Sequence, residues 1–272
     1  MLKKIKIGII GCGTIGTQLA QAIEQRFSQE ADLFALCDID KDKTQALKAK
    51  VSSGPKILSI DELINSCDLI VESASARISF EVAQKALTHN RDVMIMSVGG
   101  ILDKAEQLFN LAESQGRNIY LPSGALCGLD AVKSASMAKI DKAILITRKP
   151  VQGLAGAPYL AEKKIDLSNI KQETIIFEGT ASEAIRGFPK NVNVCATLSL
   201  AGIGAHKTKV KIITSPNYKS NIHEIQLEGD FGKLVARTEN LPSPTNPKTS
   251  FLASLSAIAT LKQILHSVKI GT

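Results

Sequence analysis

Residues 3–38 read KKIKIGIIGCGTIGTQLAQAIEQRFSQEADLFALCD and contain the glycine-rich stretch Gly11-Cys12-Gly13-Thr14-Ile15-Gly16. An apolar run, Ile5 to Ile10, precedes these glycines, and residues 15–27 carry apolar side chains at helical spacing. A second apolar run, Leu33 to Cys37, ends at Asp38. A strand, a glycine turn, a helix, a strand and an acid in this order are the context in which G-x-G-x-x-G predicts dinucleotide binding.

Each glycine of the motif has a separate task in such a unit. Gly11 permits a tight turn, Gly13 lets backbone amides approach a pyrophosphate, and Gly16 lets the helix pack closely on the strand. The unpaired amides at the start of the helix then hold the phosphates. The cofactor contacts predicted in this stretch are Gly11, Gly13, Thr14, Ile15 and Gly16.

The acid at the end of the second strand bears on the choice of cofactor. The carboxylate of Asp38 can accept both hydroxyls of an adenosine ribose, and its charge would repel a 2'-phosphate. We therefore expect NAD. Lys41 and Lys43 lie close enough in sequence to leave NADP as an alternative.

A further buried strand, Asp68 to Glu72, ends in the small residues Ser73 and Ala74. In a doubly wound sheet, ligands bind outside the carboxyl ends of the strands. Ser73 and Ala74 are thus predicted to lie near the cofactor, and a plain turn of small residues is the alternative interpretation.

The alternation of strands and helices continues as far as Leu121. This pattern predicts an α/β fold of the Rossmann type, in which helices cover both faces of a doubly wound parallel sheet. We expect this dinucleotide-binding domain to span residues 1–125.

The pattern then changes to strand-like segments separated mainly by turn residues. These segments are 143–147, 173–177, 207–213, 222–227 and 233–237. Pairing of near neighbours predicts a mostly antiparallel sheet, and hence a second, α+β domain over residues 126–272. Residues 250–266 carry apolar side chains at helical spacing and predict a long core helix.

Composition narrows the class of protein. The chain has 272 residues, 44% hydrophobic residues, a net charge of +7 and no tryptophan. The lysines are scattered and aromatic residues are few, so the charge indicates a solvated surface rather than a nucleic-acid site. Such a surface also suits an anionic substrate or cofactor.

The amino-terminal residues resemble a signal peptide, because Lys3 and Lys4 precede an apolar run. That run is shorter than a usual signal core and continues into the glycine motif, so we expect no export. No later apolar segment reaches the roughly 20 residues of a membrane span. Five cysteines with no C-x-x-C pair favour a reduced, cytoplasmic protein without a metal site.

Two of the four histidines are candidates for chemistry. In the segment NIHEIQLE (221–228), the period of two places His223 on the face of Ile225 and Leu227. An imidazole on an inward face is either a satisfied core histidine or a site residue. His206 shares a face with Val210, and the pattern alone does not decide between the two histidines.

Other polar residues have plain structural interpretations beside functional ones. Cys127 precedes a helix start, where a thiolate is stabilised, yet it also fits as a small buried residue. Asn191, Asn193 and Asn240 lie near predicted helix ends or turns, where asparagine often serves as a cap.

Several segments in addition to the glycine motif resemble the L-aspartate dehydrogenases linked to NAD biosynthesis. They are PSGALCGLD (122–130), TRKP (147–150), FPKNVNV (188–194), NIH (221–223) and ENLPSPTNPKTS (239–250). They occur in the order of that family and span nearly the whole chain.

The resemblance implies a two-domain enzyme, usually a homodimer, whose last helix returns to the first domain. It implies that His223 is catalytic and that Ala125 contacts the cofactor. It also implies a cofactor contact from Asn191 or Asn193, and we favour Asn193.

The activity implied is the NAD(P)-dependent oxidation of L-aspartate to iminoaspartate, which water converts to oxaloacetate and ammonia. His223 would act as general acid and base, because an imidazole exchanges protons near neutrality. The substrate carboxylates need cations or amide donors. The candidates, which the sequence does not rank, are Arg148, Lys149, Arg186, Lys190 and Lys248.

Two other functions are consistent with the same architecture. One is a homoserine- or semialdehyde-type dehydrogenase that uses Cys127 or a lysine. The other is a protein that senses NAD without turnover, although an inward polar residue in an additional domain disfavours it.

Overall fold

The computed structural model describes residues 3–189, 193–244 and 246–271, without the side chains of residues 247 and 248. The chain forms two compact units. The first unit extends to Pro122 and includes Ser254–Lys269, and the second contains Ser123–Ala253.

The first unit is built on a six-stranded parallel sheet with strand order β3-β2-β1-β4-β5-β6. Its strands are β1 (Ile5–Ile10), β2 (Ala31–Cys37), β3 (Lys56–Ile57), β4 (Leu69–Glu72), β5 (Asp92–Ile95) and β6 (Ile119–Tyr120). This order reverses between β1 and β4, which is the place where a doubly wound sheet binds its ligand. The predicted fold class is confirmed.

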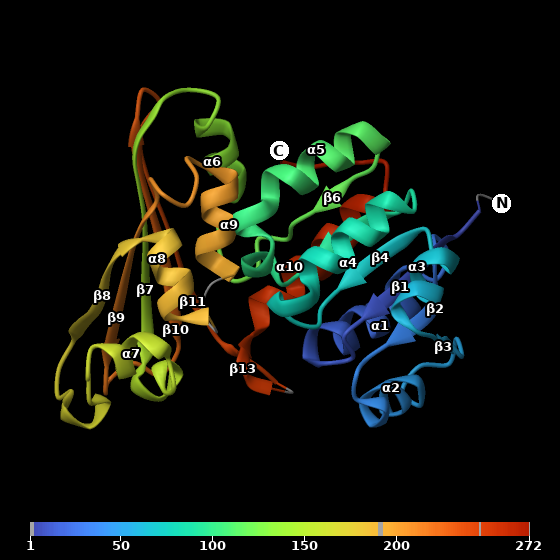
Figure 1. Cartoon of the computed structure of the whole chain (residues 1–272), viewed down its shortest axis with the longest axis horizontal. Coiled ribbons are helices and arrows are strands. Elements are labelled where there is room, and N and C mark those ends of the chain that lie inside the picture. Colours follow the sequence, from blue (N-terminus) through green and yellow to red (C-terminus); the bar gives the residue numbers. More distant parts are fainter. Residues whose placement is uncertain (1–2, 190–192, 245, 272) are drawn as a thin grey trace. The chain divides into compact units, whose positions relative to one another are not determined.

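Helices cover both faces of this sheet (Figure 1). They are α1 (Thr14–Arg26), α2 (Lys41–Lys48), α3 (Ile60–Ser66), α4 (Ala76–Thr88), α5 (Ala105–Gln115) and α10 (Phe251–Leu265), with the short 3-10 turns η1 (Val98–Gly100) and η2 (Leu102–Lys104). Leu19 of α1 and Leu261 of α10 share one apolar cluster with Ile7 and Ile9 of β1. Gly8, which points the other way, lies against Leu63 of α3.

Local sequence explains where these helices begin. Ser59 accepts a hydrogen bond from the backbone N–H of Glu62, whose carboxylate accepts from the backbone of Ser59 in return. This reciprocal capping box fixes the start of α3, as the sequence pattern predicts. Helix α1 begins at Thr14, and the capping position before it is Gly13, which has no side chain to cap the first amides.

The second unit is built on a five-stranded sheet with strand order β11-β10-β7-β9-β8. Its strands are β7 (Ile140–Pro150), β8 (Thr174–Thr180), β9 (Lys209–Ser215), β10 (Asn221–Gly229) and β11 (Gly232–Asn240). The pair β7 and β9 is parallel, and the other three neighbouring pairs are antiparallel. The sheet is therefore mostly antiparallel, as predicted.

Helices pack on one face of this second sheet (Figure 1). They are α6 (Leu129–Ala135), α7 (Pro158–Glu162), α8 (Ala181–Gly187) and α9 (Asn193–Ala201), with the 3-10 turns η3 (Val151–Leu154) and η4 (Leu167–Asn169). Three aromatic rings stand at the centre of this packing. The ring centroids of Phe177 and Phe188 lie 5.6 Å apart, and Tyr159 lies within 5.3 Å of both.

The stretch before the last helix, which the sequence left without a predicted element, is a short strand. Residues Asn246–Ser250 form strand β13, which pairs with β12 (Pro242–Ser243), and α10 begins only at Phe251. Within the described residues, no helix is both long enough and apolar enough to cross a membrane.

The packing of α10 predicts a large effect of one substitution. Leu261 is fully buried in the apolar cluster of the first unit, whereas Leu255 of the same helix is 38% exposed. Leu261→Ala should lower the free energy of unfolding by about 2 to 5 kcal/mol, because it leaves a cavity. Urea unfolding followed by circular dichroism measures the change. An equal, small loss in the control Leu255→Ala and in Leu261→Ala would contradict this packing.

Candidate active site

The glycine loop has the geometry that its sequence predicts. Gly11 has a φ of 99°, and a Cβ there would lie 2.5 Å from the backbone nitrogen of Ala74. A Cβ on Gly16 would collide with the carbonyl oxygen of Gly11. A Cβ on Gly13 would meet no atom of the residues that the structure describes within 4 Å, so the space beside its backbone is open. The loop thus offers room and helix-start amides to an anionic group.

Asp38 braces this loop from the end of β2. Its carboxylate accepts hydrogen bonds from the backbone N–H groups of Cys12, at 2.7 Å, and of Asp40, at 2.9 Å. A carboxylate offers about four acceptor positions, so two remain for ribose hydroxyls. Lys43, one of the two lysines that left NADP open, pairs with Asp40 at 3.4 Å.

Ser73 and Ala74 lie at the same edge of the sheet and are held by hydrogen bonds. The Ser73 hydroxyl donates to the carbonyl oxygen of Gly11 at 2.8 Å, which joins the end of β4 to the glycine loop. The N–H of Ala74 donates to the carboxylate of Glu72 at 2.9 Å. Glu72 is fully buried, and burial raises its pKa. It also accepts from the backbone and hydroxyl of Ser97, so it ties β4 to β5. Sequence reasoning missed Glu72, although an acid at the end of an apolar strand is a visible signal.

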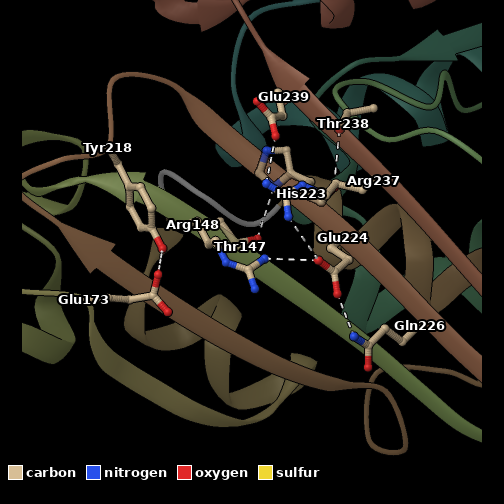
Figure 2. A network of polar contacts seen from close by, with 10 residues as sticks. All are labelled: Thr147, Arg148, Glu173, Tyr218, His223, Glu224, Gln226, Arg237, Thr238 and Glu239. Atoms are coloured by element: carbon tan, nitrogen blue, oxygen red, sulfur yellow. Dashed lines mark hydrogen bonds and ion pairs between the residues drawn. The ribbon is translucent and has the colours of Figure 1, made fainter.

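In the second unit, His223 lies on the helix-covered face of the sheet and is 4% exposed. The register pairs it with Thr147 of β7 and Thr238 of β11. The Thr147 hydroxyl lies 3.1 Å from Nδ1 of His223 (Figure 2). The neighbouring row of the same face is apolar, since Leu145 pairs with Val210 and Ile225. The site therefore begins where the apolar face becomes polar.

Burial decides the protonation state of His223. Burial, and to a lesser extent the positive charge of Lys149, lowers the pKa of the imidazole to about 3. A neutral imidazole has one nitrogen that donates and one that accepts. With Nδ1 beside Thr147, Nε2 is the nitrogen that can exchange a proton with a bound molecule. A neutral imidazole can accept a proton, but a pKa well below neutrality makes it a weaker base than the exchange near pH 7 that the sequence led us to expect.

Asn240 completes the polar end of this face, and sequence reasoning had taken it for a cap. Its Nδ2 donates to the carbonyl oxygen of Ala125 at 3.1 Å, and the hydroxyl of Thr238 donates to the same oxygen at 3.0 Å. Ala125 is thereby fixed beside the row of His223. The Oδ1 atom of Asn240 is buried and has no hydrogen-bond partner among the described residues. An acceptor in that state suits a donor group of a ligand.

The remaining candidates lie in different surroundings. Asn193 is exposed and begins helix α9, and Asn191 lies outside the described residues. His206 is exposed in a turn, so the structure selects His223 as the buried histidine. Burial raises the pKa of the Cys127 thiol, which disfavours the thiolate that a nucleophile needs.

A charged network occupies the opposite face of the sheet (Figure 2). Arg148 pairs with Glu224 at 3.2 Å, and Glu224 also accepts a hydrogen bond from Gln226 at 2.6 Å. Successive residues of a strand point to opposite faces, so this network and His223 are on different sides. Arg148 is thereby engaged away from the imidazole.

Two family models match the chain. The model described as "Aspartate dehydrogenase, C-terminal" matches residues 130–264. The model described as "Homoserine dehydrogenase, NAD binding domain" matches residues 11–122. Together they cover both units.

Relatives match over nearly the full length. An L-aspartate dehydrogenase of Methanosarcina mazei is 51% identical, over 98% of this chain and 100% of its own. One of Methanococcus maripaludis is 42% identical over the same shares. A solved aspartate dehydrogenase of Thermotoga maritima is 24% identical with a TM-score of 0.76, and covers 99% of this chain and 100% of its own. This last likeness shows the shared fold.

The lowered pKa of His223 predicts a loss of stability in acid. Between pH 6.5 and about 3, the unfolded chain binds a proton that the folded chain does not. The free energy of unfolding therefore falls as the pH falls through this window. Between pH 7 and pH 4, the free energy of unfolding of His223→Gln should fall by about 1 to 3 kcal/mol less than that of the wild type. Urea unfolding at both pH values, with His206→Gln as control, checks this. Equal acid sensitivity of the wild type and His223→Gln would contradict the burial of a neutral imidazole.

Proposed function

Because this chain belongs to the L-aspartate dehydrogenase family, we propose that it oxidises L-aspartate to iminoaspartate with a nicotinamide dinucleotide. The observation that carries the proposal is the buried, neutral His223 in the domain that matches the aspartate dehydrogenase model. When bound, the nicotinamide ring supplies the acceptor for the hydride from the alpha carbon.

The chain's own residues perform the remaining tasks. Nε2 of His223 takes a proton from the substrate amine as the alpha carbon loses its hydride, so the carbon–nitrogen bond becomes an imine. The same imidazole then assists the water that converts the imine to oxaloacetate and ammonia. Thr147 orients the ring through Nδ1. The apolar row beside it keeps the imidazole out of bulk water.

We propose the glycine loop, Asp38, Ser73 and Ala74 as cofactor contacts of the first unit. The open space at Gly13 supports a bound pyrophosphate, because a side chain there would fill it. The free acceptor positions of Asp38 support NAD as the preferred cofactor. Ala125 and Asn193 are the proposed contacts of the second unit, and Asn191 stays the alternative to Asn193 as a cofactor contact, as the sequence resemblance implies.

We propose that the chain acts as a homodimer. No described helix covers the face of the second sheet that is opposite to His223 (Figure 1). Val235 on that face is 68% exposed, and Ile175 is 53% exposed. Apolar side chains on an open sheet face are typical of an interface. We also propose, as the sequence pattern predicts, that the dinucleotide-binding domain ends at residue 125.

The cellular setting is a further part of the proposal. All five cysteines, which lie within the described residues, are free thiols. Free thiols fit a reducing compartment, and we propose the cytoplasm. Family membership supports a role in supplying iminoaspartate to pyridine nucleotide biosynthesis.

The homoserine-type alternative loses its main support. The family model named for homoserine dehydrogenase covers only the nucleotide-binding unit. The raised pKa of Cys127 disfavours the thiol mechanism that this alternative uses.

The activity is tested by following NADH formation from L-aspartate. The wild type should be active, and His223→Ala should lose at least about a hundredfold in kcat, since general base catalysis contributes that much. His206→Ala, which changes an exposed histidine, should behave as the wild type. Full activity of His223→Ala would remove the proposed role of the imidazole.

The cofactor preference is tested at Asp38. Asp38→Asn keeps an oxygen that accepts from Cys12 but removes the charge that faces the ribose. The ratio of kcat/KM with NAD to that with NADP should fall about tenfold or more, because a 2'-phosphate no longer meets a carboxylate. Steady-state kinetics with both cofactors measures it. An unchanged ratio would show that another residue discriminates between them.

A further inference from the structure

The substrate of the proposed reaction carries two carboxylates, so the site needs a cation. The structure separates the candidates that the sequence left unranked. Arg148 pairs with Glu224 on the face opposite to His223. Arg186 is exposed on α8 and lines an outer cavity with Tyr159. Lys190 lies outside the described residues, as does the side chain of Lys248. Lys149 is the candidate that shares a face with the imidazole.

The register places Lys149 one row beyond His223. Residues 147 and 149 of β7 point to the same face, and Thr147 pairs with His223. Along a strand, two residues span about 7 Å, which the side chain of a lysine can cover. In the row of Lys149, Thr214 is its partner on β9, and Asn221 pairs with Asn240 further along the sheet. This row is polar, like the neighbouring row of His223 and Thr147.

The burial of Lys149 is unusual. It is 9% exposed, and it is the one lysine or arginine classed as buried among the residues whose burial is described. Burial lowers the pKa of its ammonium to about 8, so most molecules still carry the charge at pH 7. A buried charge destabilises a fold compared with an apolar side chain of similar volume. Residues that break the rules of packing in this way mark functional sites.

We propose that the ammonium group of Lys149 binds a carboxylate of the substrate beside His223. The proposal rests on the proposed function, because it assigns one carboxylate of the L-aspartate substrate to the row of Lys149. A bound dianion would offset the desolvation of the lysine, and the carboxylate would be held one row from the imidazole that acts on the amine. Lys149 is then a residue that selects dicarboxylates over other amino acids.

The first test removes the charge of Lys149 and keeps a side chain of similar size. Lys149→Met should raise the KM for L-aspartate about ten- to hundredfold, as expected for the loss of a charged hydrogen bond, and leave the KM for NAD within about twofold. Its melting temperature is measured alongside, to separate a loss of fold from a loss of substrate binding. A residue that served only the fold would give a lower melting temperature and no specific effect on aspartate.

The matched control lies on the same strand. Lys142 is exposed and pairs with Glu228 at 3.6 Å on the opposite face. Lys142→Met should therefore match the wild type in both KM values. A wild-type KM for L-aspartate in Lys149→Met, or an equal rise in both variants, would overturn the proposal.

Substrate amides identify which carboxylate is bound. L-asparagine lacks the side-chain charge, and the alpha-amide of L-aspartate lacks the other. Lys149→Met should lose the preference of the wild type for L-aspartate over one of these amides and keep it over the other. Retention of both preferences would also count against Lys149.

A last measurement separates this proposal from the proposed function. Succinate is a dicarboxylate without an amine, and its binding is measured by calorimetry in the presence of NADH. If the wild type fails to oxidise L-aspartate, the proposed function is wrong. Binding of succinate to the wild type and its loss in Lys149→Met would still support the lysine. Equal binding to both proteins, or binding to neither, would refute it.

Discussion

Desolvation at the polar end of the second sheet is the constraint on which the rest of this protein depends. His223 stands beside rows of apolar side chains on the same face, and burial keeps the imidazole neutral at pH 7. Removal of water strengthens every remaining electrostatic interaction. Burial against the sheet therefore strengthens the interactions of a few polar groups with a ligand. The same burial of polar groups lowers the stability of the fold.

The nucleotide-binding unit solves a different physical problem, that of holding a loop without bulky side chains. Gly11 and Gly16 bring backbone atoms too close for a Cβ, and Ser73 and Asp38 fasten the loop by hydrogen bonds to its backbone. Glu72 joins β4 to β5 in the same way, because its carboxylate accepts hydrogen bonds from the backbone N–H groups of Ala74 and Ser97. The loop is thus shaped by contacts from the ends of β2 and β4, and the space at Gly13 stays open.

The sequence predicted those features that depend on near neighbours. The glycine loop and the inward face of His223 follow from spacing along one segment. The sequence alone does not predict the register between strands that are distant along the chain. Thr147 and His223 are 76 residues apart, so the row that joins them, and with it the position of Lys149, requires the folded sheet. Asn240 was missed for the same reason, since its partner Ala125 is 115 residues away.

Helix α10 has a consequence for how the protein is made. Its residues complete the core of the unit that begins the chain, although they are among the last to be joined. Domains usually fold as units while the chain is being synthesised. Here the ribosome releases the whole second unit before the nucleotide-binding unit has its final helix. The unit that is encoded first therefore cannot complete its apolar cluster until nearly the whole chain has been synthesised.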